Sequence, residues 1–224
     1  MYTLDANLIK NMFDKIAFKY DFINNLISFG THYFVKKKVI SNLKIEPNTK
    51  VLDLCCGTGD LGKIIKKIQP SCDVVGIDFS SQMIELARKN NPNITYWEMD
   101  ATTLSFEKNS FDYIVMGFGL RNIEQKNKTL EEVHRVLKAN GKFLHLDFGI
   151  SSIFNGIYDN FVLFISKIFI KDTKPLKYLI LSKKRFLSSN ELIDLFKFNK
   201  LFCVQKDELC FKMISYQIMK KNSV

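Results

Sequence analysis

The chain has 224 residues, 46% of them hydrophobic and 25% charged, and its formal net charge is +10. Length and composition predict a single soluble domain with a substantial core, and no apolar run is long enough to cross a membrane. The charge favours nucleic acid or an anionic membrane surface as a partner, or else reflects a lysine- and asparagine-rich composition spread over solvated faces.

The five cysteines form no paired framework, and no Cys-x-x-Cys pair or histidine cluster completes a metal site. We therefore expect free thiols in a reducing compartment and no bound metal. The first apolar residues are interrupted by Asp5, Lys10 and Asp14, which is not the pattern of a signal peptide. These observations favour a cytoplasmic protein.

Residues 1–46 carry apolar side chains at helical spacing and predict helices over residues 4–26 and 33–43. Residues 47–149 then alternate strand-like and helix-like runs, which predicts a parallel sheet with crossover helices. Asn140-Gly141 is read as the stop of the last of these helices. The strands are expected to begin near residues 51, 73, 93, 113 and 142, and the helices near residues 60, 81 and 126.

Beyond residue 149 the alternation stops. Residues 150–187 are rich in aromatic residues and lysines and predict one or two inserted helices. Residues 188–224 predict a final helix, which starts at Ser188-Ser189-Asn190-Glu191, and two strands in a hairpin. The sequence therefore predicts a single α/β domain with a doubly wound, mostly parallel seven-stranded sheet, helices on both faces and an antiparallel last strand.

The stretch from Val51 to Leu61 is the most informative in the chain. A buried strand ends near Asp53, the glycine turn Gly57-Thr58-Gly59 follows, and a helix begins at Asp60. Glycines at such a turn let a ligand approach the backbone closely. With Gly62, the same spacing also fits the dinucleotide-binding fingerprint.

Charge separates the two candidate ligands of this turn. A pyrophosphate requires a helix N-terminus without competing anions, yet Asp53, Asp78 and Asp100 all stand near strand ends that share one crevice. Such a cluster of acids suits a cationic ligand without phosphate, and S-adenosylmethionine has that chemistry. The dinucleotide alternative keeps one argument, because Asp78 lies where a ribose-binding acid is expected.

Several motifs give the chain a family resemblance over nearly its whole length. It resembles the bacterial-type quinone C-methyltransferases of ubiquinone and menaquinone biosynthesis, which are class I S-adenosylmethionine-dependent enzymes with a Rossmann-like fold. The resemblance implies that residues 1–46 form a helical lid, 47–149 the cofactor-binding core, 150–187 a helical insert, and 188–224 the closing helix and hairpin. The matching motifs are residues 13–24 with Ser28-Phe29-Gly30-Thr31-His32, residues 51–61, residues 111–114 with Gly117-Phe118-Gly119-Leu120-Arg121-Asn122, residues 132–138, residues 178–179 with 187–192, and residues 216–220.

The resemblance implies a set of cofactor contacts. Asp78 would accept hydrogen bonds from the ribose hydroxyls, and Asp100-Ala101 would meet the adenine. Gly117 stands where family members often carry a serine, so its contact would come from the backbone. The complete set of expected cofactor-binding residues is Asp53, Gly57, Thr58, Gly59, Asp78, Phe79, Met83, Asp100, Ala101 and Gly117.

The implied reaction is methylation of a polyprenyl quinol at a ring carbon, on demethylmenaquinol, on 2-polyprenyl-6-methoxy-1,4-benzoquinol, or on both. Arg121 and Asn122 are expected to hold the phenolate, and His32 to handle the proton. Tyr20, Asp21 and Asn24 are expected to contact the substrate. The competing interpretations are a surface Arg121 paired with Glu124 or Glu132, a surface His32, and a Tyr20 that only fills the core.

The prenyl tail needs lipid or an apolar groove, so we expect the aromatic and basic insert to lie on the inner face of the cell membrane. A homodimer is compatible with the sequence, and nucleic acid is not expected as a partner. The rival activities are a methyltransferase that acts on RNA or another small molecule, and a non-catalytic scaffold that binds the cofactor. The nucleic-acid enzymes would require a Pro-Cys or Pro-Pro-aromatic motif, but residues 117–120 read Gly-Phe-Gly-Leu.

Overall fold

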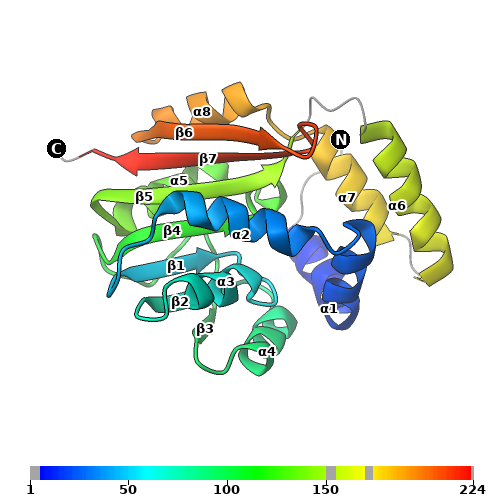
Figure 1. Ribbon diagram of the computed structural model, residues 1–224, viewed down its shortest axis with the longest axis horizontal. Coiled ribbons are helices and arrows are strands. Elements are labelled where there is room, and N and C mark those ends of the chain that lie inside the picture. Colours follow the sequence, from blue (N-terminus) through cyan, green and yellow to red (C-terminus); the bar gives the residue numbers. More distant parts are fainter. Residues whose placement is uncertain (1–5, 150–154, 170–173, 223–224) are drawn as a thin grey trace.

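The computed structural model describes residues 6–149, 155–169 and 174–222 (Figure 1). Its centre is a seven-stranded sheet with the strand order β3-β2-β1-β4-β5-β7-β6. All neighbouring strands are parallel except β7, which runs antiparallel to both β5 and β6. The predicted sheet, with its antiparallel last strand, is therefore confirmed. The strands are β1 Lys50–Leu54, β2 Asp73–Asp78, β3 Thr95–Glu98, β4 Phe111–Gly117, β5 Leu137–Phe148, β6 Leu201–Leu209 and β7 Ile214–Lys221.

The central strands are apolar and buried because helices cover both faces of the sheet. One face packs against α2 (His32–Leu43), α3 (Asp60–Ile68) and α4 (Ser81–Asn90). The other packs against α5 (Lys126–Val136) and α8 (Ser189–Phe198). From β1 the strand order runs outward through β2 to β3, whereas from β4 it runs the other way to β5, so the order reverses between β1 and β4. A ligand crevice is expected beyond the carboxyl ends of the two strands at such a point.

The remaining helices form a cap at this carboxyl end (Figure 1). They are α1 (Ala6–Ile27), α6 (Asn155–Phe169) and α7 (Lys174–Lys184). The lid and the insert were predicted as separate segments, but they share one apolar cluster. Its members are Ile23 and Ile27 from α1, Val162 from α6, and Leu176 and Ile180 from α7.

The end of α5 differs from the sequence-based expectation. The helix ends at Val136, four residues before the predicted stop, because Leu137 pairs with Phe111 of β4. The ladder then shifts register, and Asn140 takes the left-handed backbone conformation (φ 61°) inside this irregularity. The start of α8 agrees with its prediction, since Ser188 and Glu191 form a reciprocal capping box.

All five cysteines are free thiols. Within the described ranges, every helix is too short or too polar to span a bilayer.

Candidate active site

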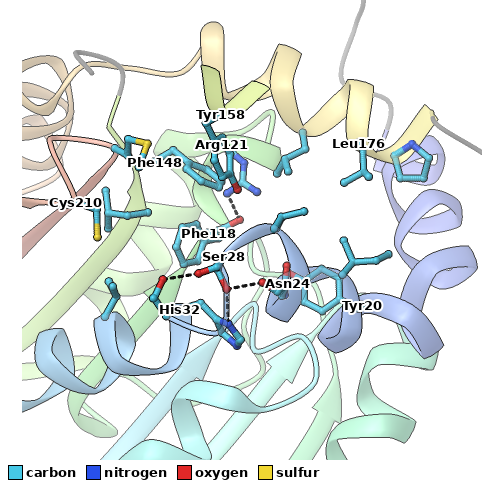
Figure 2. A pocket seen from close by; sticks show the side chains of 18 of the residues that line it. Tyr20, Asn24, Ser28, His32, Phe118, Arg121, Phe148, Tyr158, Leu176 and Cys210 are labelled. Atoms are coloured by element: carbon cyan, nitrogen blue, oxygen red, sulfur yellow. Dashed lines mark hydrogen bonds between the residues drawn. The ribbon is translucent and has the colours of Figure 1, made fainter. Parts of the chain in front are cut away.

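Two cavities lie beneath the cap at the carboxyl ends of the strands. The smaller, of about 160 Å³, lies beside the glycine turn and the ends of β1, β2 and β4, and we call it the cofactor cavity. The larger, of about 270 Å³, lies between α1, α7 and the sheet, and we call it the apolar cavity (Figure 2). Phe13, Tyr20 and Phe118 line both of them. A ligand in one cavity therefore lies next to a ligand in the other.

The cofactor cavity is acidic. Asp78, Asp100 and Glu124 line it, and none of the described residues around it is a lysine, arginine or histidine. A pyrophosphate would face uncompensated carboxylates here, whereas a sulfonium or ammonium group would be stabilised. The predicted cofactor contacts that line this cavity are Gly57, Asp78, Phe79, Met83, Asp100, Ala101 and Gly117.

Asp78 is held rigidly at the end of β2. Its Oδ2 accepts a hydrogen bond from the backbone N–H of Gly57 at 2.9 Å, and its Oδ1 accepts one from Ser80 N–H at 3.0 Å. Burial raises the pKa of this carboxyl, although the backbone donors oppose that effect. Gly57 has a φ of 54°, and a Cβ there would meet no atom within 4 Å, so the turn leaves open space beside Asp78.

Three of the predicted cofactor residues, Asp53, Thr58 and Gly59, line neither cavity. Asp53 is 1% exposed, its Oδ2 accepts from Gly62 N–H at 2.8 Å, and burial raises its pKa to about 7. It thus holds the first turn of α3 and does not face the cofactor cavity. A Cβ on Gly59 would lie 2.4 Å from Tyr96 Oη, so packing against β3 accounts for that glycine.

Thr58 connects the glycine turn to the lid. Its hydroxyl donates to Asp21 Oδ1 at 2.7 Å, and Asp21 likewise lies outside both cavities. The structure therefore pairs a predicted cofactor residue with a predicted substrate residue, and neither of them lines a cavity.

The apolar cavity gathers the other predicted residues. Tyr20 and Asn24 of α1, His32 of α2 and Arg121 line it, whereas Asn122 lies on the cofactor side (Figure 2). Arg121 and Asn122 belong to a 3₁₀ turn, η1 (Leu120–Asn122), directly after β4.

Arg121 is a buried cation, not a surface one. It is 6% exposed, and its Nη1 donates to Asp147 Oδ1 at 2.7 Å and to the Phe118 carbonyl at 2.6 Å. Its guanidinium lies near the faces of the Phe118 and Phe148 rings, with 5.2 Å to the Phe148 centroid. Arg121 Nε and Asp147 Oδ2 are buried without a hydrogen-bond partner in the described structure. Both atoms have almost no accessible surface, so Nε does not open onto the cavity, and Arg121 contributes a buried positive charge to the cavity wall.

His32 is half-buried at the first turn of α2. Its Nδ1 lies 2.9 Å from Ser28 Oγ, and its Nε2 lies 3.8 Å from Asp60 Oδ2. Burial, together with the nearby Lys36, lowers the pKa of His32, so the ring is neutral at pH 7. A neutral imidazole at the cavity wall is able to accept a proton.

Some residues of the site were not identified from the sequence. Asp147 is the buried partner of Arg121, but as one acid in a strand it carries no distinguishing local pattern. Tyr178 of α7 donates from its hydroxyl to Asn122 Oδ1 at 3.1 Å, which joins the insert to η1. Phe118 lies within the family motif of residues 117–122, yet only the structure shows that it lines both cavities.

Residues 1–221 match the ubiE/COQ5 methyltransferase family. A demethylmenaquinone methyltransferase of Staphylococcus aureus (strain JH9) is 35% identical over 199 residues, which is 84% of this chain and 83% of that protein. Among solved structures, a SAM-dependent methyltransferase of Aquifex aeolicus superposes with a TM-score of 0.64 at 17% identity, over 83% of this chain and 89% of the other. A phosphoethanolamine N-methyltransferase of Haemonchus contortus, solved with S-adenosylhomocysteine, superposes with a TM-score of 0.70 at 15% identity, over 94% of this chain and 58% of the other.

The two structural likenesses establish the fold, and the sequence match establishes the family. S-adenosylmethionine fits the cofactor cavity, because carboxylates and no basic side chains line its described wall and the turn at Gly57 is open. The dinucleotide alternative is rejected on the same charges. The chain belongs to the ubiE/COQ5 methyltransferase family and is an S-adenosylmethionine-dependent methyltransferase of class I fold.

Proposed function

We propose that this protein methylates a ring carbon of a polyprenyl quinol, and that demethylmenaquinol is its substrate. The observation that carries the proposal is the meeting of the apolar cavity and the acidic cofactor cavity at Phe13, Tyr20 and Phe118. The apolar cavity suits an aromatic ring and the first part of a prenyl chain. The naphthoquinol is preferred to the benzoquinol because the 35% identical relative is a demethylmenaquinone methyltransferase.

The reaction needs an electron-rich ring carbon. When bound, S-adenosylmethionine supplies an electrophilic methyl group on its sulfonium. A quinol hydroxyl becomes a better electron donor when it gives up its proton, and the substituted carbon finally loses its hydrogen as a second proton. The protein therefore has to align the ring, stabilise phenolate charge and accept protons.

Arg121 is assigned to the phenolate. The Asp147 carboxylate and the Phe118 carbonyl fix one side of its guanidinium, and the buried Nε has no partner in the described structure. A fixed cation at the cavity wall stabilises negative charge on the ring oxygen. Asn122, held by Tyr178 and the Phe118 carbonyl, keeps η1 in place on the cofactor side.

His32 is assigned to the proton. It is neutral at pH 7, lies at the wall of the apolar cavity and comes from the motif that carries the family resemblance. Proton transfer to such a base contributes about 10²- to 10⁴-fold to a rate.

The proposal is tested with labelled S-adenosylmethionine. The enzyme is incubated separately with chemically reduced demethylmenaquinol and with the methoxy-benzoquinol precursor, and the labelled lipid is identified. We expect the label in menaquinol. Label in the methylated benzoquinol alone would make the benzoquinol the substrate in place of demethylmenaquinol, and label in neither lipid would refute quinol methylation.

Arg121→Ala should abolish transfer and leave S-adenosylmethionine binding intact, since Arg121 lies on the apolar side. This result separates an enzyme from a cofactor-binding scaffold. Arg185→Ala is the control, because Arg185 is exposed just after α7 and lines neither cavity.

We further propose that the cap lies on the inner face of an anionic membrane, from which the prenyl tail enters the apolar cavity. Phe29 supports this, because it lines that cavity, is 76% exposed and stacks on Phe161 of α6 with ring centroids 4.9 Å apart. A cytoplasmic location follows from this proposal. A homodimer remains a prediction from the sequence.

A further inference from the structure

We propose that Ser28 and Asp60 are positioning residues for His32. Ser28 fixes the imidazole proton on Nδ1, which leaves the lone pair of Nε2 to accept a proton, and Asp60 then stabilises the imidazolium. The inference rests on the proposed function only for the source of that proton, a quinol hydroxyl.

The tautomer follows from the single proton of Ser28. The Ser28 hydroxyl lies 2.6 Å from the Asn24 carbonyl, 3.4 Å from the Asn25 carbonyl and 2.9 Å from His32 Nδ1. The short contact to Asn24 uses the hydroxyl proton, since a carbonyl is only an acceptor. Ser28 Oγ is then an acceptor toward His32, so Nδ1 carries the ring proton and Nε2 does not.

The turn between α1 and α2 holds this geometry in place. Gly30 N–H donates to the Asn25 carbonyl at 2.8 Å, and Thr31 donates to the Ser28 carbonyl through both its N–H (3.0 Å) and its hydroxyl (2.6 Å). Ser28 is therefore fixed by its carbonyl and by its hydroxyl. Figure 2 shows Ser28 directly beside the His32 ring, with Asn24 next to it.

The charges around His32 come from three helices. Asp60 of α3 has its Oδ2 3.8 Å from Nε2, which is beyond hydrogen-bond distance but within reach of an ion pair after protonation. Lys36 of α2 pairs with the same oxygen at 2.8 Å and lowers the pKa of His32, while Asp21 of α1 and Asp60 act in the opposite direction. Burial and Lys36 thus favour the neutral ring, and Asp60 partly offsets the cost of charging it.

The first test reads the tautomer directly and does not depend on the substrate. The chain has three histidines, so ¹³C- and ¹⁵N-labelled imidazole signals can be assigned by substitution. We expect His32 in the Nδ1–H form in the wild type and a mixture of tautomers in Ser28→Ala. Ser41→Ala is the matched control, because Ser41 makes the same hydrogen bond to a carbonyl four residues earlier but is exposed on α2.

The same imidazole signals, followed as the pH is varied, give the pKa of His32. Asp60→Asn should lower this pKa below the wild-type value, because it removes a charge that raises it. An Nε2–H ring in the wild type, or an unchanged ring in Ser28→Ala, would overturn the inference whether or not the enzyme methylates a quinol.

The second test is kinetic and uses a short-chain demethylmenaquinol. Ser28→Ala should lower kcat by about tenfold and leave the S-adenosylmethionine Kd unchanged, whereas Ser41→Ala should match the wild type. His32→Ala should lose about 100-fold in kcat and regain part of it with added imidazole. Full activity of Ser28→Ala would refute the positioning role. Absence of transfer by the wild type, with the expected tautomer present, would refute only the quinol as substrate.

Discussion

We expect cofactor selection to depend most directly on Asp78. It lines the acidic cavity and is fixed by two backbone donors, so its free lone pairs are oriented before a ligand arrives. We predict that Asp78→Asn weakens S-adenosylmethionine binding by about ten- to 100-fold, because a charge-assisted hydrogen bond contributes about 1.5–3 kcal/mol. Isothermal titration calorimetry measures the change.

Asp112→Asn is the control for this measurement, since Asp112 pairs with Lys138 at the amino end of β4. The raised pKa of Asp78 also means that its carboxylate is lost at a higher pH than an ordinary aspartate would be. Affinity should therefore begin to fall, as the solution is acidified, at that higher pH. Wild-type affinity in Asp78→Asn would contradict the assignment.

At this scale the sequence identified which acids stand near the crevice, but not how far along its strand each one lies. Asp53 is the fourth residue of β1, on the face of Val51 that packs against α3, whereas Asp78 is the last residue of β2. Asp53 pairs with Gly76 in the parallel register, so Asp78 shares its face of the sheet but lies two residues nearer the carboxyl end. Position along the strand, and not the face, therefore separates the acid buried under α3 from the acid that lines the cavity. Arg121 was uncertain for a related reason: its partner Asp147 lies 26 residues away.

Among the elements, α1 is joined to the cofactor core by polar contacts. Asp21 accepts from Thr58, Asp14 accepts from Ser80, and Lys10 pairs with Glu98 at the exposed end. Because α1 contributes Phe13 and Tyr20 to the cofactor cavity, we expect these contacts to open when the ligand exchanges. The lid is thus held by a few bonds whose loss is measurable.

We predict that Asp21→Ala raises the dissociation rate of S-adenosylmethionine about fivefold, since a typical hydrogen bond contributes about 1 kcal/mol. Limited proteolysis within α1 should become faster as well. Lys10→Ala should change neither rate, because its ion pair is exposed and such pairs contribute little. Equal behaviour of the two variants in stopped-flow dissociation would show that Asp21 does not hold the lid.

Element types and their order were predictable because each depends on local periodicity. The cap was not, since Ile23 and Ile27 meet Val162, Leu176 and Ile180 across most of the chain. No pattern within a segment specifies a partner so distant. The predicted end of α5 was wrong for the same reason, because the pairing of Leu137 with Phe111 of β4 overrides the local helix signal.

Over the whole molecule, the net charge of +10 gives the cap basic outer faces, because the acids of the cap point into the protein. In the described side chains of α1, α6 and α7 these acids are Asp14, Asp21 and Asp159. They bond to Ser80, Thr58 and Lys183 inside the protein. The exposed faces of the same helices carry lysines and aromatic side chains, which suits an anionic, partly apolar surface. The exposed residues include Lys15, Phe18, Lys19, Phe164, Lys177 and Lys184.

We predict flotation of the protein with phosphatidylglycerol vesicles and little flotation with phosphatidylcholine alone. Lys15→Glu and Lys19→Glu should each weaken binding by at least about fivefold, since a basic residue near such a surface contributes about 1 kcal/mol. Phe18→Ser should also weaken binding relative to the wild type, whereas Phe198→Ser should leave binding unchanged. Phe18 and Phe198 are 78% and 76% exposed, but Phe198 ends α8, outside the cap. If both phenylalanine variants lose binding equally, or if the wild type floats with neither lipid, the cap is not a membrane surface. The prenyl chain would then have to reach the apolar cavity through water or on a carrier.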